Sequence, residues 1–249
     1  MTIRTLYDDP ELYDGLQTTS AAQLNHYLKL ARQCPGSVLE LGCGSGQLLV
    51  PLASLGVAAT GLDLSSPMLR AAARRAAAAG VPVRLIEGDM RAFDLECKFS
   101  LIFVARNTLL HLSEPDDFAG FFSSVRRHLE PNGILAFDVF NTNLQLLSRP
   151  SGQRFQVMKK TLPGYGEVTV EAMNDYDVRS QVNRATWFIS TAEERDARVV
   201  PLHLRSIFPQ ELLVLLALNG LHLVRRDGDF SGGTYTSSSV SQVRQCRLA

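Results

Sequence analysis

Short apolar runs alternate with helical patterns over residues 36–140 of this 249-residue chain. Short apolar runs bounded by turn residues predict buried strands, and helical spacing of apolar residues predicts amphipathic helices. The predicted strands are SVLELG, VAATGLDL, PVRLIEGDM, FSLIFVAR and GILAFDVF, the last after a Pro-Asn-Gly turn, with helices over 47–54, 66–79 and 114–130. Strands that alternate with helices in this way indicate a parallel, doubly wound sheet.

Downstream of this region the pattern changes to strands in series. RFQVMKKT, EVTVEAMNDYD, VNRATWFIST and VVPLHLRSIF predict an antiparallel β-layer inserted over 150–208. A helix and a hairpin of LHLVRRDGDF with SVSQVRQCRLA complete the core over 209–249. We therefore expect a single α/β domain over 1–249, with a cofactor-binding core over 36–141. Its Rossmann-like, mostly parallel seven-stranded sheet would end in the antiparallel hairpin.

The charge balance disfavours a nucleic-acid or membrane partner. Lysine plus arginine total 25 and aspartate plus glutamate total 25, so no overall positive field attracts a phosphate backbone or an anionic membrane. The four cysteines lack the spacing of a metal site, which predicts free thiols and no metal. No charged leader and no long apolar segment are evident, so we expect a cytoplasmic protein.

A glycine-rich motif, Gly42-Cys43-Gly44-Ser45-Gly46, stands where the first predicted strand ends and a helix begins. Glycines there let a ligand approach the backbone, and a following helix presents free N–H groups. Tight turns also use glycine for structural reasons alone, so the motif needs support from its surroundings.

Two acids follow the next two predicted strands. Asp63 ends the second strand and Asp89 ends the third. An acid at the first of these places can accept hydrogen bonds from ribose hydroxyls, and the second could bind an adenine amine. Each could instead be a helix N-cap. Together with the glycine motif, the pair predicts a site for an adenosine.

The succession E-L-G-C-G-S-G, L-D-L-S-x-x-M, G-D-M and L-x-P-N-G resembles the class I S-adenosylmethionine-dependent methyltransferases, in their small-molecule branch. The resemblance implies S-adenosyl-L-methionine as the cofactor. It also implies that Gly42, Gly44 and Gly46 border its methionine part, and that Arg106 and Asn107 lie near the methyl-donating sulfur.

The same resemblance implies the residues that hold the adenosine part. Asp63 would bind the ribose, and Leu64 and Met68 would flank the adenine ring. Asp89 would accept a hydrogen bond from the adenine amine, and Met90 would offer its backbone N–H.

Methyl transfer from a sulfonium requires alignment of the nucleophile and exclusion of water, and a hydroxyl nucleophile also needs a base. His111, just past the fourth strand, is the best candidate base, although it could equally pack the loop. Tyr13 lies in a segment that resembles the cofactor lid of small-molecule members, or it could only dock the N-terminus. Candidate acceptor-binding residues come from the fifth strand and the insert: Asp138, Asn141, Tyr176, Trp187 and Arg205.

We therefore expect a methyltransferase that acts on a nitrogen or oxygen nucleophile of a small-molecule acceptor. One alternative is an NAD(P)-dependent oxidoreductase, although the dinucleotide fingerprint G-x-G-x-x-G is replaced here by G-x-G-x-G. Another is a non-catalytic, cofactor-binding accessory module. Edge strands of the insert could also pair two copies into a homodimer.

Overall fold

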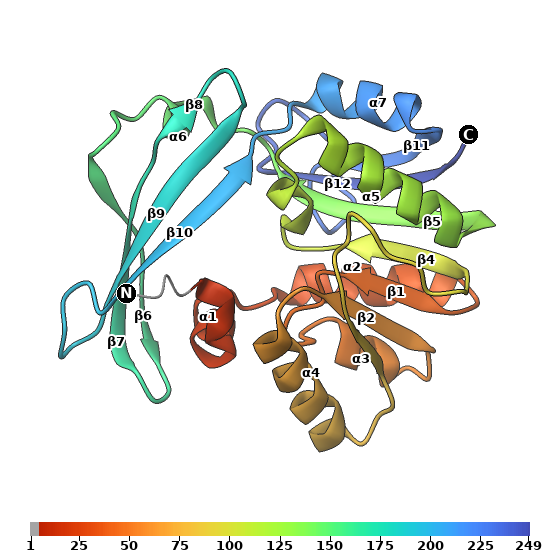
Figure 1. Cartoon of the computed structure of the whole chain (residues 1–249), viewed down its shortest axis with the longest axis horizontal. Helices are drawn as coiled ribbons and strands as arrows, with labels where there is room; N and C mark the ends of the chain where they lie inside the picture. Colours follow the sequence, from red (N-terminus) through yellow and green to blue (C-terminus); the bar gives the residue numbers. More distant parts are fainter. Residues whose placement is uncertain (1–4) are drawn as a thin grey trace. The chain divides into compact units, whose positions relative to one another are not determined.

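The computed structural model describes residues 5–249, which form two compact units. The larger unit comprises Thr19–Asn141 and Ile207–Ala249. The smaller unit comprises Thr142–Ser206 together with the described residues up to Thr18. Figure 1 shows that each unit contains its own sheet.

The larger unit contains a seven-stranded sheet in the order β11-β12-β5-β4-β1-β2-β3. The strands from β1 to β5 are parallel, and β12 runs antiparallel to both β5 and β11. This confirms the predicted Rossmann-like sheet with its antiparallel C-terminal hairpin. The strands are β1 (Val38–Leu41), β2 (Ala59–Asp63), β3 (Arg84–Glu87), β4 (Phe99–Val104), β5 (Leu129–Phe140), β11 (Leu221–Asp227) and β12 (Ser241–Leu248).

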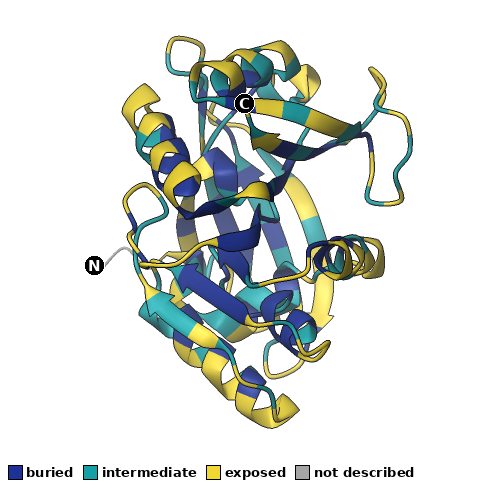
Figure 2. Cartoon of the chain, turned by 90° about the vertical axis from the view of Figure 1, so that its right-hand side faces the viewer, coloured by how far each residue is buried: buried dark blue, intermediate teal, exposed yellow. Residues whose placement is uncertain are grey.

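Helices cover the sheet of the larger unit and bury its apolar strands (Figure 2). Tyr27 and Leu30 pack with Val38, Leu101 and Phe103 in one buried cluster. The predicted helix over 66–79 is present with the same bounds, because Ser65 caps its start and Gly80 ends it with a left-handed φ of 66°. The helices are α2 (Ala21–Gln33), α3 (Leu49–Ala53), α4 (Ser66–Ala79), η2 (Thr108–His111), α5 (Pro115–His128) and α7 (Pro209–Leu218).

The start of the fifth strand differs from the prediction. The Pro-Asn-Gly segment was expected to be a turn before the strand, but β5 already begins at Leu129 and includes it. Phe99 pairs with Leu129 and Leu101 pairs with Ile134, so the segment bulges from the ladder. Proline has no N–H to give to a ladder, and a bulge accommodates it inside a strand.

The smaller unit contains an antiparallel sheet in the order β10-β9-β7-β6, with β8 beside β9. Its core includes Leu12, Val168, Val170 and Trp187, so Trp187 is a core residue of this sheet. The elements are η1 (Leu6–Asp8), α1 (Pro10–Leu16), α6 (Leu144–Leu147), β6 (Arg154–Leu162), β7 (Gly166–Met173), β8 (Tyr176–Asp177), β9 (Val182–Ser190) and β10 (Arg198–Arg205).

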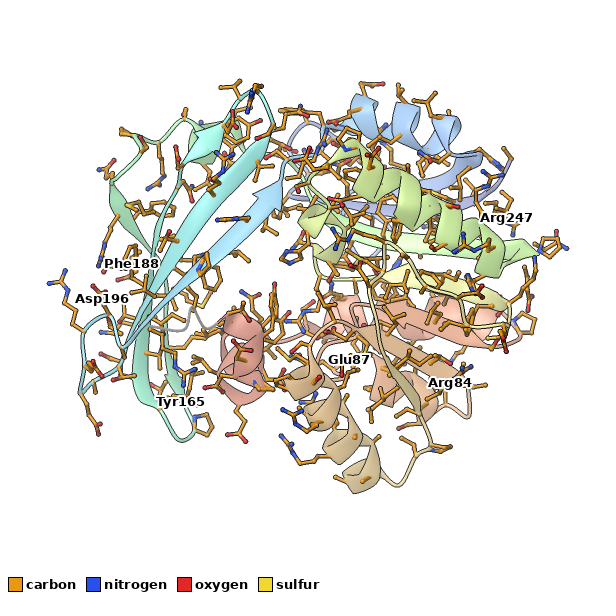
Figure 3. All side chains as sticks on the ribbon, in the orientation of Figure 1. Arg84, Glu87, Tyr165, Phe188, Asp196 and Arg247 are labelled. Carbon is orange, nitrogen blue, oxygen red and sulfur yellow. The ribbon has the colours of Figure 1, made fainter. Side chains whose placement is uncertain are left out.

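A polar group covers part of this smaller sheet. The Arg154 guanidinium lies 3.4 Å from the ring centre of Phe188, and its Nη1 donates to Asp196 Oδ2 at 2.9 Å. Figure 3 labels Phe188, on β9, and Asp196, in the loop between β9 and β10. The guanidinium is therefore held by both stacking and charge.

Three of the four cysteines are buried. Cys34, Cys43 and Cys246 lie inside the protein, and Cys97 is exposed. Burial raises the pKa of each buried thiol, that of Cys246 to about 12. In the described part of the chain, no cluster of three metal-binding side chains occurs, and no helix is long and apolar enough to cross a membrane.

Candidate functional site

The glycine-rich loop follows β1 and needs its glycines for two different reasons. Gly42, Gly44 and Gly46 have φ values of 70°, 53° and 77°, which disfavour any other residue. A Cβ on Gly42 would lie 2.4 Å from Cγ2 of Thr108, whereas a Cβ on Gly44 would meet no atom within 4 Å. The loop therefore packs tightly at Gly42 and faces open space at Gly44.

Asp63, at the end of β2, is tied to this loop through backbone amides. Its Oδ2 accepts from the Gly44 N–H at 2.7 Å, and its Oδ1 accepts from the Ser65 N–H at 2.8 Å. Burial raises the pKa of Asp63, and these hydrogen bonds oppose the rise. Asp63 remains partly exposed beside the loop, so ribose binding is a feasible role and stays a prediction.

The two other residues of the loop, Cys43 and Ser45, have structural roles. Cys43 is 4% exposed, so its side chain belongs to the core and only its main chain can border a ligand. The Arg75 guanidinium, on α4, donates to the carbonyl oxygen of Ser45. This contact holds the outer part of the loop against α4.

Glu40, near the end of β1, opens the motif E-L-G-C-G-S-G, although the sequence reasoning assigned it no role. It is 3% exposed, and its Oε2 has no hydrogen-bond partner among residues 5–249. Burial raises the pKa of Glu40 well above its usual range, and the nearby charge of Arg106 partly offsets this. The available signal was a carboxylate inside the otherwise apolar run SVLELG, because a buried acid requires a partner.

Arg106 and Asn107 follow β4 in an unusual backbone conformation. Their φ values are 61° and 63°, both left-handed. The Arg106 N–H donates to Asp138 Oδ2 at 3.0 Å, and Asn107 Oδ1 accepts from the Phe140 N–H at 2.6 Å. The Arg106 guanidinium contacts Thr19 Oγ1 at 3.4 Å. Two links to β5 therefore position this turn.

Asp89, predicted to bind the adenine amine, is already engaged by a cation. Arg91 Nη2 lies 2.6 Å from Asp89 Oδ2, and Arg91 Nη1 lies 2.9 Å from Asp117 Oδ1. Hydrogen bonding to Arg91 lowers the pKa of Asp89. Any hydrogen bond to adenine would have to be accepted alongside Arg91, and the role of Asp89 stays a prediction.

The three other predicted adenosine contacts differ in exposure. Leu64 is 70% exposed, an unusual state for a large apolar side chain at the end of a buried strand. Met68 is 1% exposed and packs inside the unit, whereas Met90 is partly exposed. Leu64 is thus available to a flat ring, and the proposed contacts of all three residues stay predictions.

His111 lies on η2, directly after the Arg106–Asn107 turn. It keeps accessible surface, yet surrounding protein atoms desolvate much of its ring and lower its pKa. Its imidazole is therefore neutral at pH 7, which is the form that can accept a proton.

The other predicted residues lie in different surroundings. Tyr13 is on α1 of the smaller unit, with its ring centre 5.6 Å from that of Tyr7, and its lid role stays a prediction. Asp138 is 4% exposed within the larger unit, while Asn141 Oδ1 accepts from the Tyr235 hydroxyl at 3.0 Å. The remaining acceptor candidates belong to the smaller unit: Tyr176, Trp187 and Arg205.

The carboxyl edge of the larger sheet thus gathers the open glycine loop, two carboxylates and one guanidinium. Residues 38–133 match the family model described as a methyltransferase domain. The chain is thus similar to methyltransferases in this region and in its fold. The methyltransferase CcbJ from Streptomyces caelestis is 28% identical and superposes with a TM-score of 0.80 over 93% of this chain and 97% of that one.

Two curated methyltransferases show how far the sequence similarity extends. YqeM of Bacillus subtilis (strain 168), a putative methyltransferase, is 34% identical over 133 residues, and the match covers 53% of each chain. The chain thus spans about half the length of this relative. The cypemycin N-terminal methyltransferase of a Streptomyces species is 25% identical over 96% of both chains. The similarity to this methyltransferase therefore also covers the inserted β-layer.

Proposed function

We propose that this protein transfers a methyl group from S-adenosyl-L-methionine to a nitrogen or oxygen nucleophile of a small molecule. One observation carries the proposal. Glu40 lies near the end of β1, Asp63 ends the neighbouring parallel strand β2 and binds the Gly44 N–H, and Glu40 keeps a buried oxygen with no partner among the described residues. A buried carboxylate oxygen without a donor suits a cationic group.

The residues present fit the two ends of this cofactor. Glu40 offers a carboxyl acceptor and Arg106 a cationic donor, the two kinds of group that the ammonium and carboxylate of a methionine moiety require. Asp63 beside the open space at Gly44 suits ribose hydroxyls, and the exposed Leu64 suits an adenine face. When bound, the cofactor supplies an electrophilic methyl group on a sulfonium.

The protein's own part in the reaction is to bind, align and deprotonate. The glycine loop allows close approach of the backbone, and His111 holds a neutral imidazole next to the Arg106–Asn107 turn. A hydroxyl acceptor would give its proton to this imidazole, whereas an amine needs only to arrive uncharged. Asn141, which follows β5 in the larger unit, is a candidate residue for holding the acceptor.

The similarity to the cypemycin N-terminal methyltransferase over nearly the whole chain favours nitrogen as the nucleophile. The chain has as many acidic as basic residues, which favours a small-molecule acceptor over a nucleic acid. We place the reaction in the cytoplasm. The edge strands β6 and β10 of the smaller sheet offer a surface for a homodimer.

The test is calorimetric titration of the protein with S-adenosylmethionine, S-adenosylhomocysteine, NAD and NADP. We expect the two sulfur nucleosides to bind and the dinucleotides not to bind. Glu40→Gln should weaken binding about 10-fold or more, and Asp63→Ala roughly 30-fold, because charge-assisted hydrogen bonds are lost. Binding of a dinucleotide, or of none of the four, would reject the methyltransferase proposal.

A further inference from the structure

The turn after β4 requires an explanation, because two adjacent residues with side chains adopt left-handed φ values. Arg106 and Asn107 have φ values of 61° and 63°. Asparagine tolerates this region better than most residues, but arginine does not, so the surrounding structure must enforce the conformation.

Asp138, on β5, supplies the contacts that enforce it. Its Oδ2 accepts from the Arg106 N–H at 3.0 Å, and its main-chain oxygen accepts from the Asn107 N–H at 3.3 Å. Both amides of the turn are therefore bound to one residue of the neighbouring strand.

Asp138 is held in turn by two side chains of α2. The Tyr27 hydroxyl donates to Asp138 Oδ1 at 2.6 Å, and Gln23 Nε2 donates to Oδ1 at 3.2 Å and to Oδ2 at 3.3 Å. Tyr27 has no exposed surface, and Asp138 is only 4% exposed.

A carboxylate buried in this way loses its hydration, and the hydrogen bonds from Tyr27, Gln23 and the Arg106 N–H replace it. Asp138 is thus the shared acceptor of two side chains of α2 and of the Arg106 backbone. The carboxylate thereby provides an acceptor aimed at the backbone of Arg106.

We propose that Asp138 is a positioning residue of the cofactor site: held by Tyr27 and Gln23, it fixes the left-handed turn that carries the Arg106 guanidinium. The inference rests on the proposed function, because it assigns Arg106 to the carboxylate end of the methionine moiety. Asp138 acts through Arg106 and is not itself in contact with the cofactor.

The test is a double-mutant cycle on S-adenosylmethionine binding, with Asp138→Ala, Arg106→Ala and the combined variant. We expect each single variant to raise the Kd about 10-fold or more. The combined variant should bind no more weakly than Arg106→Ala, because Asp138 has no route to the cofactor once the guanidinium is removed. If the Kd of the combined variant instead rises by the product of the two single factors, the role of Asp138 is merely structural and the proposal is overturned. An unchanged Kd for Asp138→Ala would also overturn it.

Two further variants keep the test decisive. If Asp138→Ala does not fold, Tyr27→Phe removes a single hydrogen bond; it should raise the Kd about threefold, and Arg106→Ala should cancel this effect. An unchanged Kd in Tyr27→Phe would overturn the proposal. The same threefold rise in the wild-type protein and in Arg106→Ala would also overturn it. Leu216→Ala on α7, a buried truncation outside the site, should lower the melting temperature and leave the Kd unchanged.

The outcome also separates this inference from the proposed function. Wild-type protein that binds S-adenosylmethionine, combined with an Asp138→Ala variant that binds equally well, would overturn only the role of Asp138. Wild-type protein that does not bind the cofactor would overturn the proposed function and this inference with it.

Discussion

The two edges of the larger sheet are built from the same residue types and differ in what those residues do. At the carboxyl edge, Gly42 packs against Thr108, and His111 keeps accessible surface. At the opposite edge, Gly56 faces open space, and His128 is 2% exposed with both ring nitrogens bonded. Parallel strands all end at the same edge of the sheet. Side chains that are available to a ligand therefore gather at the carboxyl edge.

The glycine pair should give the largest contrast. Gly42→Ala adds a methyl group against Thr108 to the left-handed strain, so we expect roughly 100-fold weaker S-adenosylmethionine binding, about 2.7 kcal/mol. Gly56 has a φ of 79° and open surroundings. Gly56→Ala should therefore lower the free energy of unfolding by about 1 kcal/mol and leave the Kd unchanged. Calorimetry and thermal unfolding measure both.

Thr108 provides the control for this prediction. Thr108→Ala removes the atom that the new methyl group would meet, and should restore part of the binding lost in Gly42→Ala. Equal losses of binding in Gly42→Ala and Gly56→Ala would remove the distinction between the two edges.

The histidine pair should separate catalysis from stability. His111→Gln should lower kcat for a hydroxyl acceptor about 100-fold, because the base is lost. Burial lowers the pKa of His111 below 6.5, so the neutral base predominates at pH 7, and wild-type activity should fall as the pH drops through that lowered pKa. This acidic limb should disappear in the variant.

His128→Gln is the matched change at the other edge. Nε2 of His128 accepts from the Leu95 N–H at 2.9 Å, and Nδ1 lies 2.7 Å from the Ser124 carbonyl oxygen, so the ring is structural. We expect a loss of about 2 kcal/mol of stability and an unchanged pH profile of kcat. A His111 variant with a wild-type pH profile would assign both histidines to structure.

The leucine pair should show the smallest effect. Leu64 is 70% exposed at the carboxyl edge, and Leu218, at the end of α7, is 79% exposed. Leu64→Ser should weaken S-adenosylmethionine binding about fivefold through lost apolar contact, whereas Leu218→Ser should not change the Kd. Unchanged binding in both variants would exclude Leu64 from the adenine site.

Local sequence patterns predicted much of the fold. The helix over 66–79 has the predicted bounds because a serine cap, a proline in the first turn and a closing glycine all mark it within the sequence. Four of the five parallel strands contain buried apolar runs, which made them predictable, whereas β3 is an edge strand that is only partly buried. In contrast, the bulge in β5 depends on pairing with β4, which no local pattern records.

The site was predicted less completely than the fold. The glycines and Asp63 follow strand ends and could be read from the sequence, whereas α2 was not predicted as an element of the site. Tyr27 and Gln23 reach Asp138 across more than a hundred residues of chain. Such contacts arise only from tertiary packing, so sequence spacing could not reveal them.

The uneven burial of the cysteines makes the protein suitable for selective labelling. Cys97 is exposed and precedes β4 at the edge opposite the glycine loop, while burial raises the thiol pKa of the other three. Thiolates, not thiols, react with maleimides, so a fluorophore should attach at Cys97 and leave Cys43 in the loop unmodified. Ligand binding could then be followed optically in the native sequence, without engineered attachment points.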